Sequence, residues 1–261
     1  MIATFLAGVR SEWLKQRRSL GAWLVLGGGL FIPGIITAVR LLRPAGLPQL
    51  YRAPGFWERL WTQSWESMAV MILPLVVMLA ASLIVQLEYR NNTWKQVHAT
   101  PQPLATIFLA KLVMILKLVV QLLFWFNAGI YLAGIVPALV FRAVDLPTSP
   151  IPFGYFLGRN LDFFVDVLPI VGLQYLLALR FRSFMAPLGA GFALWILALG
   201  ALPWEYNYVI PYAYLAIDYT TTVQSRVSHA LPASPQAFAA AWFVVFTGVA
   251  YVVYAAKGDK G

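Results

Sequence analysis

Two aspartates four residues apart, Asp162 and Asp166, have the types and spacing in this chain that come closest to an active site. Residues at this spacing share one face of a helix, so the pair could hold a cation or act as a carboxylate pair. Arg159 lies three residues before the pair and can neutralise it. The same residues also fit a solvated helix start, and this is the interpretation that we adopt for them.

The other chemistry-bearing residues form no recognisable catalytic or metal-binding motif. The chain has no cysteine and two histidines, His98 and His229, and it contains no HExxH, GxSxG or P-loop sequence. The topology predicted below puts the two histidines on opposite sides of a membrane, where they cannot share a metal. We therefore expect no enzyme activity and no cofactor in this chain. If the protein uses ATP, another chain must bind it.

The composition indicates a membrane protein. Apolar residues make up 61% of the 261 residues and charged residues 11%, against roughly 25% charged in a soluble domain. Six apolar segments reach about the 20 residues that a helix needs to cross a bilayer. They run roughly over residues 20–39, 68–87, 112–136, 161–179, 184–202 and 237–256. The predicted fold is an all-α integral membrane protein of one domain, residues 1–261, with six transmembrane helices.

The positive charges predict the orientation of these helices. An even number of spans puts both termini on one side, and loops rich in lysine and arginine stay in the cytoplasm. The side of the termini holds Arg10, Lys15, Arg17, Arg18, Arg90, Lys95, Arg180, Arg182, Lys257 and Lys260, against Arg40, Arg43, Arg52, Arg59, Arg142, Arg159 and Arg226 on the other. We predict that both termini are cytoplasmic. Because the basic residues lie at the ends of apolar segments, the formal charge of +9 indicates orientation in a bilayer and not nucleic-acid binding.

Three further segments are predicted to lie at the membrane surface. Residues 1–18 repeat apolar residues at helical spacing, which predicts an interfacial helix, with a frayed tail as the alternative. Trp57, Trp61 and Trp65 recur every four residues, which predicts an indole stripe that anchors an outer helix at headgroup depth. A substrate-binding aromatic stripe is the alternative. Residues 203–236 are rich in tyrosine and proline yet apolar, which is typical of short re-entrant or interfacial helices.

One polar stretch separates the second and third apolar segments: residues 88–101, EYRNNTWKQVHATP. A short helix here would surround the indole of Trp94 with the polar side chains of Arg90, Asn91, Thr93, Lys95 and Gln96. An aromatic residue ringed by polar groups is common at protein interfaces. An ordinary loop whose Trp94 returns to the lipid headgroups is the alternative. The density of hydrogen-bonding side chains in this connection favours docking on another protein.

The same stretch carries a family resemblance. Glu88, Thr93, Trp94, Lys95 and Pro101, followed by PLATIFLAKL with Lys111, resemble the hallmark of ABC transporter permeases of the type-2 exporter class. The likeness is closest to the short six-helix permeases of antibiotic or bacteriocin export and immunity, and the N-terminal SEWLKQRRS is similar to their start. It covers nearly the whole chain. It implies an elbow helix over residues 1–18, a coupling helix over 88–100 and re-entrant segments over 203–236.

The resemblance also implies partners, a location and a function. Cytoplasmic ABC ATPase subunits would bind ATP and Mg²⁺ and would hold the coupling residues Glu88, Arg90, Thr93, Trp94, Lys95 and Gln96. A second permease, identical or related, would complete the membrane part in a bacterial cytoplasmic membrane. The implied function is ATP-driven export of an amphipathic or hydrophobic molecule, such as a peptide antibiotic, a drug or a lipid.

Four polar residues at membrane depth are candidates for the substrate pathway: Lys117, Gln121, Asn127 and Gln174. Polar side chains at this depth usually face a protein interior or a cavity. Hydrogen bonds between helices account for each of them as well as substrate contact does. Two other functions stay open. One is an ATP-independent channel or proton-coupled carrier, which would need carboxylates inside the membrane, and the other is a scaffold or sensor that transports nothing.

Overall fold

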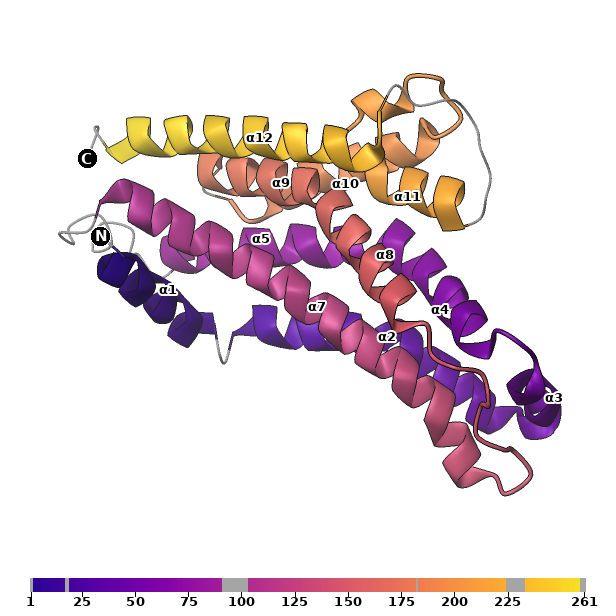
Figure 1. Ribbon diagram of the computed structural model, residues 1–261. Helices are drawn as coiled ribbons and strands as arrows, with labels where there is room; N and C mark the ends of the chain where they lie inside the picture. Colours follow the sequence, from indigo (N-terminus) through magenta and orange to yellow (C-terminus); the bar gives the residue numbers. More distant parts are fainter. Residues whose placement is uncertain (1, 17–18, 91–102, 182, 224–232, 259–261) are drawn as a thin grey trace.

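The computed structural model describes residues 2–16, 19–90, 103–181, 183–223 and 233–258. Every regular element within these residues is helical (Figure 1). Five helical stretches are long and apolar enough to cross a membrane, and a sixth apolar helix, α10 (Met185–Gly200), is shorter. The five stretches are Leu20–Leu42, Phe56–Gln86, Leu104–Val140, Phe153–Arg180 and Pro235–Ala256. The prediction of an all-α, multi-span membrane protein is confirmed.

Three of the long spans are single helices and two are composite. The single helices are α2 (Leu20–Leu42), α7 (Leu104–Val140) and α12 (Pro235–Gly258). The second span joins α4 (Phe56–Ser67) through a π-helical turn, η2 (Met68–Ile72), to α5 (Leu73–Arg90). The fourth span joins α8 (Phe153–Asp166) to α9 (Leu168–Arg180). The break between α8 and α9 precedes Pro169, which lacks the amide N–H that an unbroken helix would use.

The remaining helices, apart from α10, are short and lie at the two ends of the bundle (Figure 1). The first, α1 (Ile2–Gln16), lies at the end that also holds both chain termini. The opposite end carries η1 (Pro44–Gly46), α3 (Leu47–Arg52), η3 (Asn207–Val209), α11 (Tyr214–Asp218) and η4 (Tyr219–Val223). Both termini therefore lie on one side of the bundle, as an even number of crossings requires. Their cytoplasmic location stays a prediction.

Close packing between spans positions the helices. α2 packs along α7, α12 packs along α9, and α5 contacts α2, α7, α9 and α10. A Cβ atom added at Gly29 of α2 would lie 2.9 Å from the carbonyl oxygen of Leu122 on α7. One added at Gly134 of α7 would lie 2.4 Å from the ring of Trp57 on α4. Glycine is needed at both positions because small residues let helices approach closely, which favours association within a lipid bilayer.

The tryptophan stripe on α4 differs from its prediction. Trp57, Trp61 and Trp65 do share one helical face, but they are only 5%, 0% and 0% exposed. Trp65 stacks on Phe163 of α8 with ring centroids 4.1 Å apart. The indoles thus pack between helices and not against lipid headgroups. The prediction of a headgroup anchor is wrong because α4 is part of the second span, and α7 and α8 cover the face that carries the indoles.

The fourth span begins earlier than predicted, at Phe153 and not near Leu161. Asp162 and Asp166 therefore lie at the end of α8 and inside the fourth span, where Asp166 is the last residue of α8 and is fully buried. The prediction of a solvated helix start is wrong for Asp166. The start of the fourth span could not be recognised in the sequence, because two glycines, Arg159 and Asn160 lower the hydropathy of the first turns of α8.

Candidate functional site

The predicted coupling residues stand at the edge of the described structure. α5 continues to Arg90, and α7 begins at Leu104, so both helix ends that flank the polar stretch are described. Thr93, Trp94, Lys95 and Gln96 lie outside the described residues, as do the side chains of Glu88 and Arg90. Their coupling role stays a prediction.

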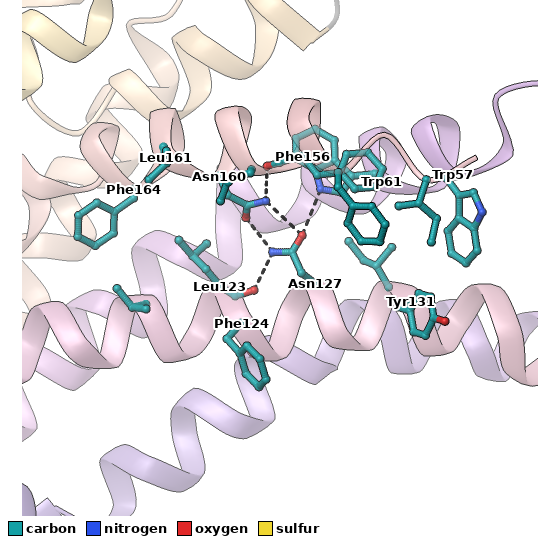
Figure 2. Close-up of a pocket in the computed structure, with 15 residues that line it drawn as sticks. Trp57, Trp61, Leu123, Phe124, Asn127, Tyr131, Phe156, Asn160, Leu161 and Phe164 are labelled. Atoms are coloured by element: carbon teal, nitrogen blue, oxygen red, sulfur yellow. Dashed lines mark hydrogen bonds between the residues drawn. The ribbon is translucent and has the colours of Figure 1, made fainter. Parts of the chain in front are cut away.

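An aromatic groove of about 480 Å³ lies between α4, α7 and α8 (Figure 2). Its walls are formed by side chains that follow one another at helical spacing along α7 and α8. They are Val120, Leu123, Phe124, Ile130 and Tyr131 of α7, and Phe153, Phe156, Leu157, Leu161 and Phe164 of α8, with Trp57 and Trp61 of α4. No charged side chain is among its described lining residues. Its volume falls within the range of small-molecule sites, about 300–1,000 Å³.

A small amide cluster forms the polar part of this groove (Figure 2). Asn127 of α7 donates to the side-chain oxygen of Asn160 on α8 over 2.8 Å and to the carbonyl of Leu123 over 2.7 Å. Its own oxygen accepts from Trp61 Nε1 at 3.3 Å and from Asn160 at 3.2 Å. The cluster therefore satisfies most of its own hydrogen-bonding capacity, and it leaves the groove with an almost wholly apolar character.

Stacked rings stiffen the groove on the side of α4. Trp61 stacks on Phe156 with centroids 5.2 Å apart, and Trp57 stacks on Tyr131 at 5.7 Å. Stacked or edge-on aromatic pairs add about 0.5–1.5 kcal/mol beyond the area they bury. The rim is formed by exposed residues such as Phe124, Leu157 and Leu161, so the groove opens on the side of the bundle. An apolar molecule could enter it sideways from a bilayer.

Of the four residues predicted for the substrate pathway, the structure brings only Asn127 into this groove. Gln174 is fully buried and joins helices instead: its amide nitrogen donates to Ser82 and to the carbonyl of Pro187, and its oxygen accepts from Tyr212. Gln121 is half-buried on α7 and does not line the groove.

Lys117 lies outside the groove as well. It is exposed, and its ammonium lies 5.7 Å from the ring centre of Trp13 on α1, a cation–π contact. Sequence reasoning missed Asn160 and Trp61 as groove residues. Asn160 fell just outside the predicted fourth span, whereas the aromatic-stripe alternative for Trp57 and Trp61 could have found the wall on α4.

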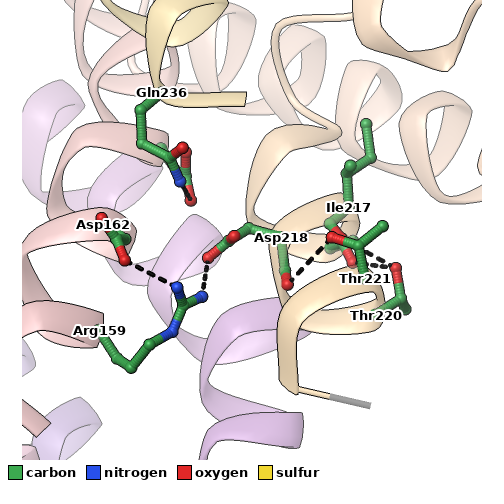
Figure 3. A network of polar contacts seen from close by, with 9 residues as sticks. Arg159, Asp162, Ile217, Asp218, Thr220, Thr221 and Gln236 are labelled. Atoms are coloured by element: carbon green, nitrogen blue, oxygen red, sulfur yellow. Dashed lines mark hydrogen bonds and ion pairs between the residues drawn. The ribbon is translucent and has the colours of Figure 1, made fainter. Parts of the chain in front are cut away.

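An ion-pair cluster (Figure 3), which we call the outer cluster, joins α8 to α11, and α11 lies at the end of the bundle opposite the termini (Figure 1). The guanidinium of Arg159 on α8 lies between Asp162, at 2.7 Å, and Asp218 of α11, to which it also donates. Asp166, one turn beyond Asp162, accepts from Gln236 of α12 at 3.4 Å. The predicted neutralisation of Asp162 by Arg159 is confirmed. Among the described residues, no group of three or more His, Cys, Asp or Glu side chains is arranged to hold a metal ion.

A second ion-pair cluster, the inner cluster, ties α1 to α7. Lys111 of α7 is fully buried and donates to Glu12 of α1 at 3.3 Å, while Lys15 donates to the same carboxylate at 2.7 Å. Burial alone would raise the pKa of Glu12, but the two lysines outweigh it and hold this pKa below its usual value. Gly8, Glu12 and Gln16 face the bundle, whereas Leu6, Trp13 and Leu14 are exposed.

These features define a class of protein. Apolar spans, polar residues that join helices, and an aromatic groove that opens on the side of the bundle describe a multi-span membrane protein. Comparison with family models gives the family: residues 9–198 match the ABC-2 family transporter protein model, so the chain belongs to the ABC-2 transporter family. The resemblance seen in the sequence is thereby confirmed. A comparison with curated proteins found no match.

Proposed function

We propose that this chain is the transmembrane subunit of an ATP-driven exporter that moves amphipathic or hydrophobic molecules out of the cytoplasm or the inner leaflet. The observation that carries the proposal is the family match, which runs from α1 through α10 and includes the polar stretch between α5 and α7. In this proposal the protein lies in a bacterial cytoplasmic membrane with both termini in the cytoplasm. ATP and Mg²⁺ bind to separate ATPase subunits.

The length of α7 supports mechanical coupling through the polar stretch. α7 has 37 residues, which span about 55 Å at about 1.5 Å per residue, whereas the hydrocarbon core is about 30 Å thick. Even a strongly tilted α7 extends beyond that core. A rigid helix that projects toward the ATPase can carry a displacement of its end into the membrane. The inner cluster adds stiffness there because it fastens α1 to α7 at Lys111.

The aromatic groove supports the substrate class. Its described lining is uncharged and almost wholly apolar, so a strongly charged molecule would lose its hydration there without gaining a partner. An apolar or amphipathic molecule loses little. Directed export further requires that the substrate bind the inward and outward arrangements with different affinity.

A second permease subunit, identical or related, completes the membrane part in this proposal. α2 and α12 support it, because only 17% of the most apolar window of each helix is buried within the chain. Their exposed faces are apolar, with Trp23, Phe31 and Ile35 on α2 and Val244, Val245 and Val252 on α12. Such faces suit contact with lipid or with another apolar helix.

Co-purification tests the proposal. We expect an ABC ATPase to co-purify with the wild-type chain in detergent, and Trp94→Ala or Glu88→Ala to weaken that association while the chain stays inserted. Trp204→Ala is the matched control, since Trp204 is exposed and lies three residues before η3, which is at the opposite end of the bundle. Unchanged ATPase recovery with Trp94→Ala would contradict the coupling role. Transport in proteoliposomes that follows a proton gradient and ignores ATP would favour a carrier instead.

A further inference from the structure

A second cavity, of about 610 Å³, is lined by other residues than the aromatic groove, in helices that meet near the end of the bundle that holds the termini. It is enclosed by the end of α1, the start of α2, the last turns of α5 and Phe184 just before α10. Leu20, Ile84 and Phe184 give it apolar walls, and Gln16, Ser19 and Gln86 add polar groups. The cavity therefore has the mixed character of a site for an amphiphile.

One polar atom of a residue that lines this cavity is left without a partner. Gln16 is 6% exposed, and its Oε1 is buried without a hydrogen-bond partner. Gln86, on the facing helix, uses its amide nitrogen to donate to the carbonyl of Phe181 at 3.2 Å. A buried acceptor that stays unpaired is unfavourable, so a bound molecule with a hydrogen-bond donor would be stabilised at Gln16.

The described lining of the cavity suits an uncharged ligand. No Lys, Arg, Asp or Glu is among its described lining residues. The nearest carboxylate on the same face of α1 is Glu12, one turn before Gln16, and it already accepts from Lys15 and Lys111. Among the described lining residues a charged ligand would find no counter-ion for its lost hydration, whereas an uncharged donor such as a hydroxyl or amide N–H would lose little.

We propose that this inner cavity binds an uncharged amphiphile whose hydroxyl or N–H group donates to Gln16 Oε1 while its apolar body packs against Leu20, Ile84 and Phe184. As a binding site the cavity stands alone. As the site that receives cargo it rests on the proposed export function, and it then narrows the substrate class to uncharged molecules with a donor at one end.

The place of the cavity in the chain links it to the polar stretch. Gln86 lies two residues before the polar stretch begins at Glu88, and one helical turn before the end of α5 at Arg90. A displacement of the end of α5 relative to α1 would change the distance between Gln86 and Gln16, and with it the space for the ligand. The cavity is thus positioned to be reshaped by whatever moves the stretch.

Three probes that share one ring system test the site. N-phenylnaphthylamine is uncharged and has one N–H donor, its N-methyl derivative has none, and anilinonaphthalene sulfonate keeps the N–H but adds a charge. Fluorescence titration of the full chain in lipid nanodiscs, with empty nanodiscs subtracted, gives each affinity. We expect the amine to bind about three- to tenfold more tightly than its N-methyl derivative, the range of one hydrogen bond, and the sulfonate to bind most weakly.

Variants assign this difference to the cavity. Gln16→Leu should remove the preference for the amine and leave the affinity of the N-methyl derivative unchanged, which a misfolded protein would not do. Ile84→Trp, or Leu83→Trp if the first variant does not fold, should fill the cavity and abolish binding of both. Leu139→Trp is the matched control on an exposed face and should change neither.

Several results would overturn the proposal. These are equal affinities of the two uncharged probes for the wild type, or equal loss of both with Gln16→Leu. Binding that survives Ile84→Trp but is lost with Leu157→Trp would place the site in the aromatic groove. The assay contains no ATPase, so its result is separate from the export function. If hydrophobic compounds stimulate a co-purified ATPase and Gln16→Leu leaves that stimulation unchanged, the cargo role fails while the export function stands.

Discussion

The inner and outer clusters fasten opposite ends of the bundle in the same way. In each, a long span provides the cation and a short peripheral helix provides the anion: Lys111 of α7 with Glu12 of α1, and Arg159 of α8 with Asp218 of α11. The inner pair is buried and the outer pair is partly buried, and each joins residues that are far apart in the chain. The short helices at both ends are therefore held to the spans by charge and not only by apolar packing.

The two clusters differ in their balance of charge. The described part of the inner cluster joins two lysines to one carboxylate, whereas the outer cluster joins one guanidinium to Asp162 and Asp218, with Asp166 a turn away. The shared residue, which contacts two opposite charges, is thus the anion Glu12 in the inner cluster and the cation Arg159 in the outer cluster. Removing the shared residue should lower the free energy of unfolding more than removing either residue that it contacts, because two charges then lose their counter-ion at once.

The largest effect is expected at Arg159. Arg159→Met keeps the apolar stem but removes the guanidinium from Asp162 and Asp218 together. Loss of one partner from a buried ion pair typically costs about 3–5 kcal/mol, so we expect a clear fall in the thermal midpoint of unfolding in detergent. Arg159→Lys should recover only part of it, since an ammonium cannot present the planar fork that two carboxylates share. An unchanged midpoint with Arg159→Met would show that this ion pair does not hold α11.

The next largest effect is expected at Glu12. Glu12→Gln keeps the shape and an accepting oxygen but removes the negative charge from Lys15 and Lys111. A charged hydrogen bond contributes roughly 1 kcal/mol more than a neutral one, so we expect a loss of about 1–2 kcal/mol in the free energy of unfolding. Thermal unfolding beside Arg159→Met measures the difference. A loss larger than that of Arg159→Met would reverse the order of the two clusters.

The pH dependence of stability sharpens the same comparison at the inner end. The pKa of Glu12 in the folded protein lies below its usual value, while an unfolded glutamate titrates near about 4.3. Glu12 therefore stabilises the fold fully above that unfolded value, and this contribution is lost as the pH falls through the folded pKa. The thermal midpoint of Glu12→Gln should fall less steeply than that of the wild type below about pH 5. Parallel slopes would mean that Glu12 does not carry this dependence.

The sequence predicted the spans but not these clusters, for a physical reason. Hydropathy is a local property, so Leu20–Leu42 and Pro235–Gly258 could be found from their own residues. The partners of an ion pair are set by tertiary packing: Lys111 meets Glu12 across 99 positions and Arg159 meets Asp218 across 59. No local pattern encodes that choice.

The aromatic groove also depends on tertiary packing that a local sequence pattern does not predict. Asn127 was recognised because a polar residue at membrane depth turns inward, and that rule needs no partner. That rule did not distinguish Asn127, which lines the groove, from Gln174, which joins helices, because both are polar groups that hydrogen-bond to a neighbouring helix. The sequence also did not predict which way the tryptophan stripe faces. An indole face packs as well against helices as against headgroups, and only the position of α8 decides between them.

The smallest effect is expected where an ion pair has good geometry but no burial. Arg52 of α3 donates to Asp145 at 2.9 Å, closer than Lys111 lies to Glu12, yet the two side chains are 72% and 63% exposed. Water screens such a pair, and exposed pairs contribute about 0–1 kcal/mol. Arg52→Ala should therefore shift the thermal midpoint far less than Arg159→Met or Glu12→Gln, and added salt should abolish what shift there is. A loss equal to that of Glu12→Gln would mean that distance, and not burial, sets the strength of the ion pairs in this protein.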